Sequence, residues 1–362
     1  MKSFNLTLLM VGLFLFSHAQ EKTDLAKDKL KGKVKSLTSS GYRVVLSDGK
    51  IERGTHVHTA TSRYNPKGYV IEFLSSTGED TIENEYVHFK EEKTTYRYDS
   101  KNNLIGTNSY LAGDVLNDSS SYKVDDKGNR IDWYTFKGDG TLKQNYTTEY
   151  DNKGHILESN EYLRNRLVNR HTFKYDEKGN QVEENMFGSD GHLRWKETFA
   201  YDAKGNLVEV TDYKQNGSFD ARFTYTYDAK GNQIEEKEFT SESSQRHKRI
   251  LTKYDGEGNV VEVNEFNDKG HFSSQCKLDK RGNHLLDVTY NPDGTLLEKI
   301  SQDYKYDDHG NEVEIERRLT DGHVSMKNMY KYEYDKKGNW LKKISYENDK
   351  PVRITERKIE YY

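Results

Sequence analysis

Cysteine and proline are almost missing from this sequence of 362 residues, which holds one Cys and three Pro. The single cysteine, Cys276, excludes an intrachain disulfide and leaves no thiol at the N-terminal region for a lipoprotein anchor. Long apolar runs are also missing beyond the first twenty residues, so we predict no membrane-spanning helix. The net charge is −4, so the chain lacks the excess of basic residues that nucleic-acid binding requires.

Apolar residues are scarce as well, at 33% against roughly 45–50% in ordinary domains. Aromatic residues are nevertheless abundant, with 27 Tyr, 14 Phe and 3 Trp, and disordered chains lack such residues. This combination favours a thin sheet with one half-covered aromatic face over a thick globular core.

The N-terminus has the pattern of a secretory signal. Lys2 is followed by an apolar run over Leu8 to Phe16, and Ser17 and Ala19 place small residues at a cleavage site. We therefore predict a signal peptide over residues 1–19 and a polar leader over residues 20–32. The protein is expected to be secreted or periplasmic.

A repeat of Tyr-Asp-x-x-Gly-Asn dominates the rest of the chain. Its turn position falls at residues 68, 102, 128, 154, 179, 205, 231, 258, 282, 310 and 338, a period of about 26. Asp at the first place of a turn accepts backbone N–H groups, and Gly at the fourth allows a positive φ. We assign this structural turn signature to Asp176, Gly179, Asp202, Gly205, Asp228, Gly231, Asp255, Gly258, Asp307, Gly310, Asp335 and Gly338.

Each repeat reads as one complete hairpin. An aromatic residue two places before the Tyr and an aliphatic residue three places after the Gly indicate a strand on each side of the turn, and looser Asp-Gly turns lie between the repeats. The fold class is therefore all-β: about eleven hairpins forming a long twisted, coiling antiparallel sheet. We place N-terminal strands or a cap at residues 33–63, the array at 64–345, and a C-terminal capping strand at 346–362.

One column conflicts with simple alternation. Eight residues after the turn Gly stands an aromatic residue, such as Phe187, which is five places beyond the aliphatic Val182. An odd spacing puts the two on opposite faces of a regular strand. We predict either a β-bulge or bend in this strand, or a wall with apolar residues on both sides.

The repeated Tyr-Asp-x-x-Gly signature resembles the YD-repeat, or RHS-repeat, family of bacterial secreted and surface proteins, which is related in repeat type to animal teneurins. The resemblance covers about residues 64 to 339. It implies a long coiling β-sheet, which in large members closes into a hollow shell around a toxin domain, and some repeats of this type are linked to carbohydrate or cell-surface binding. Here Asn mostly replaces the usual Arg after the Gly, and no toxin domain follows. The resemblance thus implies a short, toxin-less envelope member.

Several rows of polar residues repeat along the chain and are candidate sites. A Lys row before the turn Gly is interpreted as an exposed turn position, and a Glu row four residues after it as a solvated face, because equivalent copies do not make one active site. His56 and His58 lack a third ligand, and Cys276 lacks a Cys–His arrangement, so we predict no metal, no cofactor and no catalytic residue.

We therefore predict a non-enzymatic protein that acts as an extended binding surface for a cell-envelope glycan or protein partner, with no nucleic acid and no membrane span. The alternative hypothesis is a structural, protective or immunity-type partner of a secreted toxin. The candidate ligand-binding residues, chosen because aromatic rings stack on sugars, are Trp133, Trp195, Tyr225, Tyr304 and Tyr332.

Overall fold

The computed structural model describes residues 23–77, 81–82, 85–86, 91–241 and 248–362. The predicted signal peptide, residues 1–19, lies outside the described residues. Within them, no helix has the length and apolarity needed to cross a membrane.

Strands make up about two thirds of the described chain, as expected for an array of hairpins joined by turns. A short helix α1 (Asp24–Lys27) precedes them, and a 3-10 turn covers Ala112–Asp114. The strands are β1 (Val34–Ser47), β2 (Lys50–Tyr64), β3 (Val70–Thr77), β4 (Thr81–Ile82), β5 (Glu85–Tyr86), β6 (Glu91–Tyr98), β7 (Leu104–Leu111), β8 (Val115–Val124), β9 (Arg130–Lys137), β10 (Leu142–Tyr150), β11 (Ile156–Leu163), β12 (Arg166–Tyr175), β13 (Gln181–Gly188), β14 (Leu193–Tyr201), β15 (Leu207–Lys214), β16 (Phe219–Tyr227), β17 (Gln233–Thr240), β18 (Lys248–Tyr254), β19 (Val260–Phe266), β20 (Phe272–Leu278), β21 (His284–Tyr290), β22 (Leu296–Tyr306), β23 (Glu312–Arg318), β24 (Val324–Tyr334), β25 (Trp340–Glu347) and β26 (Lys350–Tyr361).

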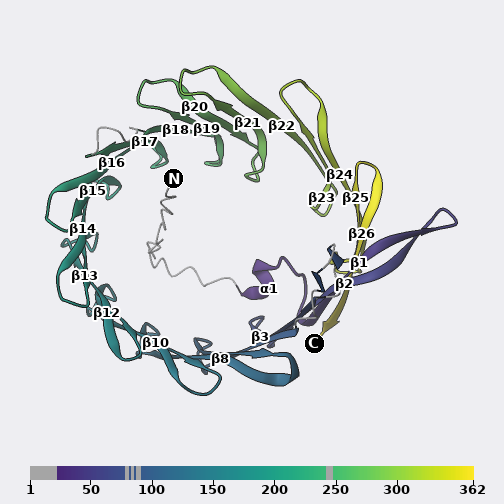
Figure 1. Ribbon diagram of the computed structural model, residues 1–362, viewed down its shortest axis with the longest axis horizontal. Helices are drawn as coiled ribbons and strands as arrows, with labels where there is room; N and C mark the ends of the chain where they lie inside the picture. Colours follow the sequence, from purple (N-terminus) through teal and green to yellow (C-terminus); the bar gives the residue numbers. More distant parts are fainter. Residues whose placement is uncertain (1–22, 78–80, 83–84, 87–90, 242–247) are drawn as a thin grey trace.

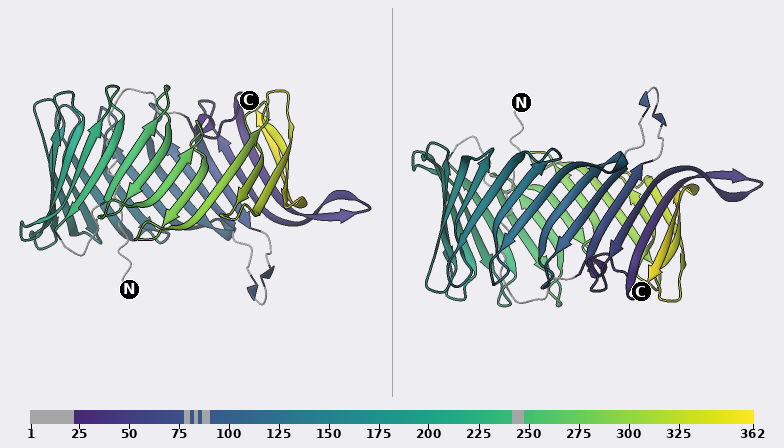
Figure 2. Two further views of the ribbon diagram at one scale, coloured as in Figure 1. Left: turned by 90° about the horizontal axis from the view of Figure 1, so that it is seen from above. Right: turned by 90° about the horizontal axis from the view of Figure 1, so that it is seen from below.

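The sheet is closed, and this corrects the predicted long twisted, coiling sheet, in which the two ends of the chain do not pair. In the described residues, 24 strands form one antiparallel sheet in chain order, and β4 and β5 form a separate pair, so that β3 is followed in the sheet by β6. Strand β26 returns to pair with β1 from Val34↔Tyr361 to Arg43↔Arg353. Figure 1 shows the resulting ring, and Figure 2 shows the tilt of its strands. Closure is favoured because it removes both exposed edge strands, whose unpaired N–H and C=O groups would otherwise remain open.

The predicted turn chemistry is confirmed residue by residue. All eleven turn positions have a positive φ, from 68° at Asn102 to 92° at Gly68 and Gly154. The looser second class behaves in the same way, with φ of 76° at Gly191 and 77° at Gly217. The two classes therefore fold as tight hairpin turns, which alternate along the chain.

The best-buried apolar side chains of the described residues lie at the seam where β1 pairs with β26. Val34, Tyr64 and Ile354, exposed by no more than 2%, come from β1, β2 and β26. Helix α1 lies inside the ring beside them (Figure 1). Elsewhere in the wall most side chains are only half-buried, as expected for a single-layered sheet.

Hydrogen bonds attach the described part of the N-terminal leader to the seam, the region where β1 and β26 close the sheet. Asp28 accepts a hydrogen bond of 2.7 Å from the Tyr64 hydroxyl, and Asp24 accepts one of 2.8 Å from the Val70 amide. Lys31 exchanges two hydrogen bonds with the Asn339 side chain, at 2.8 and 2.9 Å. The leader thus ties the first strands of the chain to the last repeat.

A two-stranded arm projects from the ring. The pairing of β1 with β26 ends at Arg43, and that of β2 with β3 begins at His58, so residues 44–57 extend away from the wall (Figure 2). Val45 and Leu46 on this arm are 48% and 63% exposed.

The odd aromatic spacing has a clear structural outcome. Met186 of β13 pairs with Trp195, whereas Phe187 pairs with Leu193, so Arg194 of the following strand is the extra residue. The irregularity therefore lies in the strand that faces the aromatic residue, and Phe187 itself follows regular alternation onto the opposite face from Met186. Both faces of the wall carry aromatic residues.

Candidate functional site: the inner face of the ring

Hydrogen bonding within the tight turns explains why Asn follows the Gly. Asp202 Oδ1 accepts the amides of Lys204 and Asn206 at 2.8 and 2.9 Å, and its Oδ2 accepts the Asn206 side-chain amide at 2.9 Å. These bonds, led by the Asn206 side chain, lower the pKa of Asp202. The Asn after the Gly is therefore explained by its bonds within the turn.

Lysines of the row before the turn Gly donate hydrogen bonds to the neighbouring turn. Lys127 Nζ donates to the Asn152 carbonyl at 2.6 Å, and Lys230 Nζ donates to the Gly256 carbonyl at 3.1 Å. Each of these cations thus reaches the turn of the next repeat. The interpretation of this row as a structural turn position fits these contacts.

The tyrosine of the signature also joins repeats. Tyr175, Tyr201 and Tyr227 donate their hydroxyls to the carbonyls of Ile156, Gln181 and Leu207, at 2.9, 2.8 and 2.7 Å. Each ring therefore spans from its own hairpin to the preceding one.

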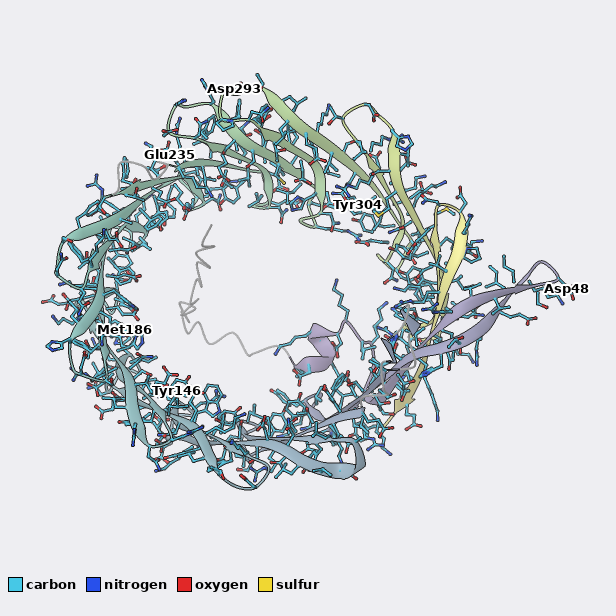
Figure 3. All side chains as sticks on the ribbon, in the orientation of Figure 1. Asp48, Tyr146, Met186, Glu235, Asp293 and Tyr304 are labelled. Atoms are coloured by element: carbon cyan, nitrogen blue, oxygen red, sulfur yellow. The ribbon has the colours of Figure 1, made fainter. Side chains whose placement is uncertain are left out.

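The glutamate row lies on the outer face, where Figure 3 places Glu235. Its members form ion pairs with cations on neighbouring strands. Glu183 contacts Lys174 and Lys196, both at 2.6 Å, and these bonds lower its pKa to about 2. The row is a paired, partly solvated surface, in agreement with the sequence interpretation.

Aromatic rings on the outer face are covered by arginines on the facing strand. The Arg170 guanidinium lies 4.6 Å from the centre of the Phe187 ring, and Arg222 lies 5.1 Å from that of Phe239. These pairs shield the outer rings from solvent.

The inner face collects all five candidate binding residues. Tyr146, Met186 and Tyr304 point into the ring (Figure 3). Trp133 pairs with Tyr146, and Trp195 with Met186, so both tryptophans share that face. Continuing the same register and strand alternation places Tyr225 and Tyr332 there as well. The five residues are nevertheless spread around the circumference and do not converge on one point.

Two of them belong to polar aromatic clusters. Trp133 stacks on Tyr146 at 5.0 Å, and Glu161 accepts the Tyr146 hydroxyl at 2.9 Å and the Asn169 side-chain amide at 2.7 Å. The Trp133 indole N–H is buried without a hydrogen-bond partner. The second cluster sets Trp195 edge-on to His171, which bonds to Glu184 at 3.1 Å.

A row of carboxylates, which the sequence analysis did not single out, crosses the same face. Glu184, Glu197 and Asp212 are successive cross-strand partners on β13, β14 and β15. Burial, together with the charge of Asp212, raises the pKa of Glu197 to about 7, and burial raises that of Asp212 to about 6. The row was missed because a strand register is needed to align acids from three strands of two neighbouring repeats.

The structure overturns one sequence statement about Cys276. His284 Nδ1 lies 3.3 Å from the Cys276 sulfur and 2.7 Å from an Asp287 oxygen, so a Cys–His–Asp group does exist. Burial and Asp287 raise the pKa of the thiol to about 11, which disfavours the thiolate needed for nucleophilic attack. His56 and His58 do not join such a group among the described residues.

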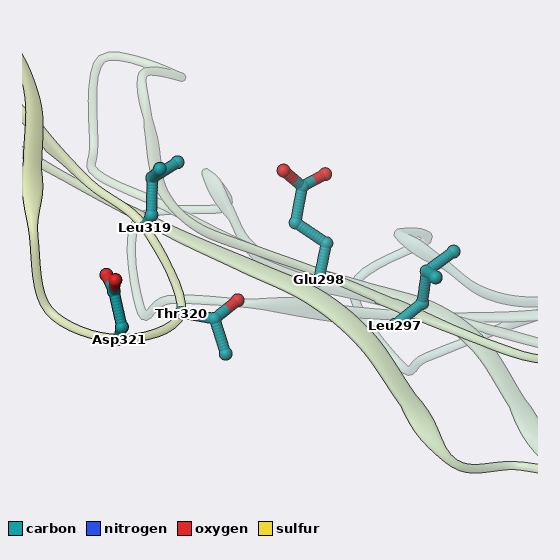
Figure 4. A pocket seen from close by; sticks show the side chains of 5 residues that line it. All are labelled: Leu297, Glu298, Leu319, Thr320 and Asp321. Atoms are coloured by element: carbon teal, nitrogen blue, oxygen red, sulfur yellow. The ribbon is translucent and has the colours of Figure 1, made fainter.

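A surface depression of about 550 Å³ lies at the start of β22, beside the turn between β23 and β24. Leu297, Glu298, Leu319, Thr320 and Asp321 line it (Figure 4). The hollow is shallow, and none of the predicted ligand-binding residues contributes to it.

These features define a class: a closed, single-layered shell of antiparallel hairpins joined by Tyr-Asp-x-x-Gly turns. Residues 134–310 match the family model described as Teneurin YD-shell. The repeat array of this chain belongs to the YD-repeat, or RHS-repeat, family.

Solved structures with a similar chain course include a TcdB2–TccC3 complex, at 9% identity and a TM-score of 0.29, over 86% of this chain and 22% of that one. The Tc holotoxin pore of Photorhabdus luminescens aligns at 11% identity and a TM-score of 0.20, over 85% and 22%. A porin-like protein from Bacteroides uniformis aligns at 12% identity and a TM-score of 0.26, over 91% and 98%. This chain thus spans less than a quarter of the first two. No curated protein matches it.

Proposed function

We propose that this protein is a non-enzymatic, exported shell whose inner face binds a glycan of the cell envelope. The observation that carries the proposal is that aromatic side chains on the inner face of the wall lie beside carboxylates and amides. Sugars present apolar ring faces and hydroxyl edges, and an aromatic ring beside a hydrogen-bonding group matches both.

The Trp133 cluster offers the first such arrangement. The stacked faces of Trp133 and Tyr146 stand beside the Glu161 carboxylate, which also holds the Asn169 amide. The indole N–H of Trp133 is buried without a partner in the described structure, so the stacked ring faces, and not this N–H, are the part that would meet the sugar. This cluster supports contact with one sugar residue.

The Trp195 cluster offers the second. Trp195 lies with Glu197 on the inner face of β14, and His171 and Glu184 stand across from it on β12 and β13. The two tryptophans lie five strands apart around the wall, on β9 and β14. An extended chain would therefore contact them in turn.

The outer face is less suited to this role. Its carboxylates, such as Glu183, are already paired with lysines, and outer rings such as Phe187 are covered by arginines. A ligand there would have to displace lysine–carboxylate ion pairs and arginine–ring contacts.

The binding test is a fluorescence titration of residues 20–362 against envelope glycans, because Trp133 and Trp195 report directly on the inner face. A saturable change in emission that is lost in Trp133→Ala or Trp195→Ala is the expected result. Phe187→Ala is the matched control, since its ring lies on the outer face of β13 and should leave binding unchanged. Silence across the glycan panel would overturn the proposal.

A protein partner is the second candidate, and the projecting arm favours it. Residues 44–57 leave the wall, and the apolar side chains of Val45 and Leu46 there are largely exposed. Such an arm is suited to strand pairing with another chain, as in a structural or immunity-type partnership. A pull-down that is lost in a Val45→Ser, Leu46→Ser variant would favour this role over glycan binding.

A further inference from the structure

The strongest unassigned chemistry in the described residues is the group formed by Cys276, His284 and Asp287. Cys276 lies on β20 and faces Asp287 of β21 directly across the ladder, and His284 begins β21. The sulfur, imidazole nitrogen and carboxylate oxygen all lie within 4.8 Å of one another. Two strands of one hairpin therefore bring three different donor types together.

The geometry excludes a nucleophilic triad. In a triad the thiol and the carboxylate bond to different nitrogens of the imidazole, so that a proton taken at one nitrogen is balanced at the other. Here both the Cys276 sulfur, at 3.3 Å, and the Asp287 oxygen, at 2.7 Å, approach the same atom, His284 Nδ1. A single nitrogen cannot accept from one partner while it donates to the other.

Three donors that converge on one region match the requirement of a metal ion instead. We propose that Cys276 Sγ, His284 Nδ1 and Asp287 Oδ1 form a binding site for a zinc-class divalent cation. A thiolate, an imidazole and a carboxylate are the ligands that tetrahedral zinc takes, at about 2.0–2.3 Å each. Three protein ligands leave the fourth position for water or for a bound molecule.

The surroundings favour the ion. Cys276 is flanked on its other side by Val263, and Asp287 by Ile300, so the directly paired neighbours on the same face are apolar and bring no competing cation. When the ion binds, the thiol proton passes to solvent as the sulfur–metal bond forms, and the charge of the ion balances the thiolate and the carboxylate. The site lies on the inner face, where the fourth position opens toward the lumen.

The test uses the whole chain, stripped of metal with a chelator and then titrated with Zn²⁺ by calorimetry and with Co²⁺ by absorption. We expect one ion per chain and a sulfur-to-cobalt charge-transfer band. Cys276→Ser should remove the band, and Cys276→Ser or His284→Ala should weaken Zn²⁺ binding by about 10-fold or more. His323→Ala, at an exposed turn residue outside the group, is the matched control and should bind as the parent does.

Circular dichroism of each variant confirms that the sheet still forms, and Asp287→Asn provides a third variant of nearly unchanged shape. Absence of one-to-one binding by the parent protein would overturn the site. Equal Zn²⁺ affinity in the parent, Cys276→Ser and His284→Ala would do the same, because the ion would then bind elsewhere.

Discussion

At the scale of single residues, the shell depends on a turn whose parts have separate tasks. Asp202 satisfies two backbone amides, Asn206 holds the carboxylate from the other side, and Gly205 adopts φ of 90°. Lys127 and Tyr227 then carry bonds from one repeat to another. The Tyr-Asp-x-x-Gly-Asn signature therefore serves mainly to form the turn and to connect neighbouring repeats.

Because this turn needs a positive φ at its Gly, replacing Gly205 and replacing Gly256 by Ala should change the free energy of unfolding differently. Gly205→Ala should lower the free energy of unfolding by roughly 1–2 kcal/mol, because a Cβ disfavours positive φ. Gly256 has equally open surroundings but no positive φ, so Gly256→Ala should be neutral or slightly stabilising. Urea unfolding followed by circular dichroism measures both, and equal effects would contradict the backbone argument.

At the scale of strands, the two faces of the wall treat carboxylates in opposite ways. Glu183 and Glu184 are neighbours on β13, yet the first lies outside among lysines and the second inside beside Glu197. Alternation of side chains along the strand produces this difference. The inner row crosses three strands without a cation among its directly paired members.

The inner row predicts an unusual pH response. The pKa of Glu197 is about 7 in the folded state against an ordinary 4.5, so between those values the folded protein holds a proton that the unfolded chain has lost. Stability from this group therefore falls as the pH rises from about 4.5 to 7. Glu197→Gln should stabilise the shell at pH 8 by about 1 kcal/mol, after allowance for partial exposure, and should change little at pH 4.

Glu183→Gln is the opposing control for that experiment. The pKa of Glu183 is lowered to about 2, so its charge stabilises the folded state above the ordinary value of 4.5, and this contribution is lost as the pH falls toward 2. The variant should therefore be less stable than the parent at pH 8. Thermal unfolding at pH 4 and pH 8 compares the two, and shifts of the same sign at pH 8 would refute the assignment of the two faces.

At the scale of the whole molecule, closure joins the ends of a chain that local signals describe only repeat by repeat. Ser36 and Glu360 are 324 positions apart, yet their side chains hydrogen-bond at 3.0 Å across the β1–β26 ladder. Val34, Tyr64 and Ile354 fill the space beneath. The seam has the best-buried apolar contacts of the described wall.

Closure predicts a cross-link. In a Cys276→Ser background, Ser36→Cys and Glu360→Cys should form a disulfide under mild oxidation, because directly facing strand positions bring Cβ atoms within about 4.5–5.5 Å. A shift in non-reducing gel mobility and protection of both thiols from alkylation report the bond. Each single-cysteine variant serves as the control, and free thiols in the double variant would show that the ring is open in solution.

The turns and strands could be predicted from the sequence because they depend on residues that are close together in the chain. Asp, Gly and Asn at fixed offsets determine the turns, and period-two alternation determines the strands. The position of Phe187 left two outcomes open, a bulge in its strand or apolar residues on both faces, and the structure shows the second. Closure was not readable, because it depends on summed twist and on the pairing of β1 with β26 across the whole chain. The register between repeats aligned Glu184 with Glu197, and the register within one hairpin set His284 and Asp287 beside Cys276. Neither register could be fixed from the sequence, since a slip of one residue in a strand reverses every side chain on it.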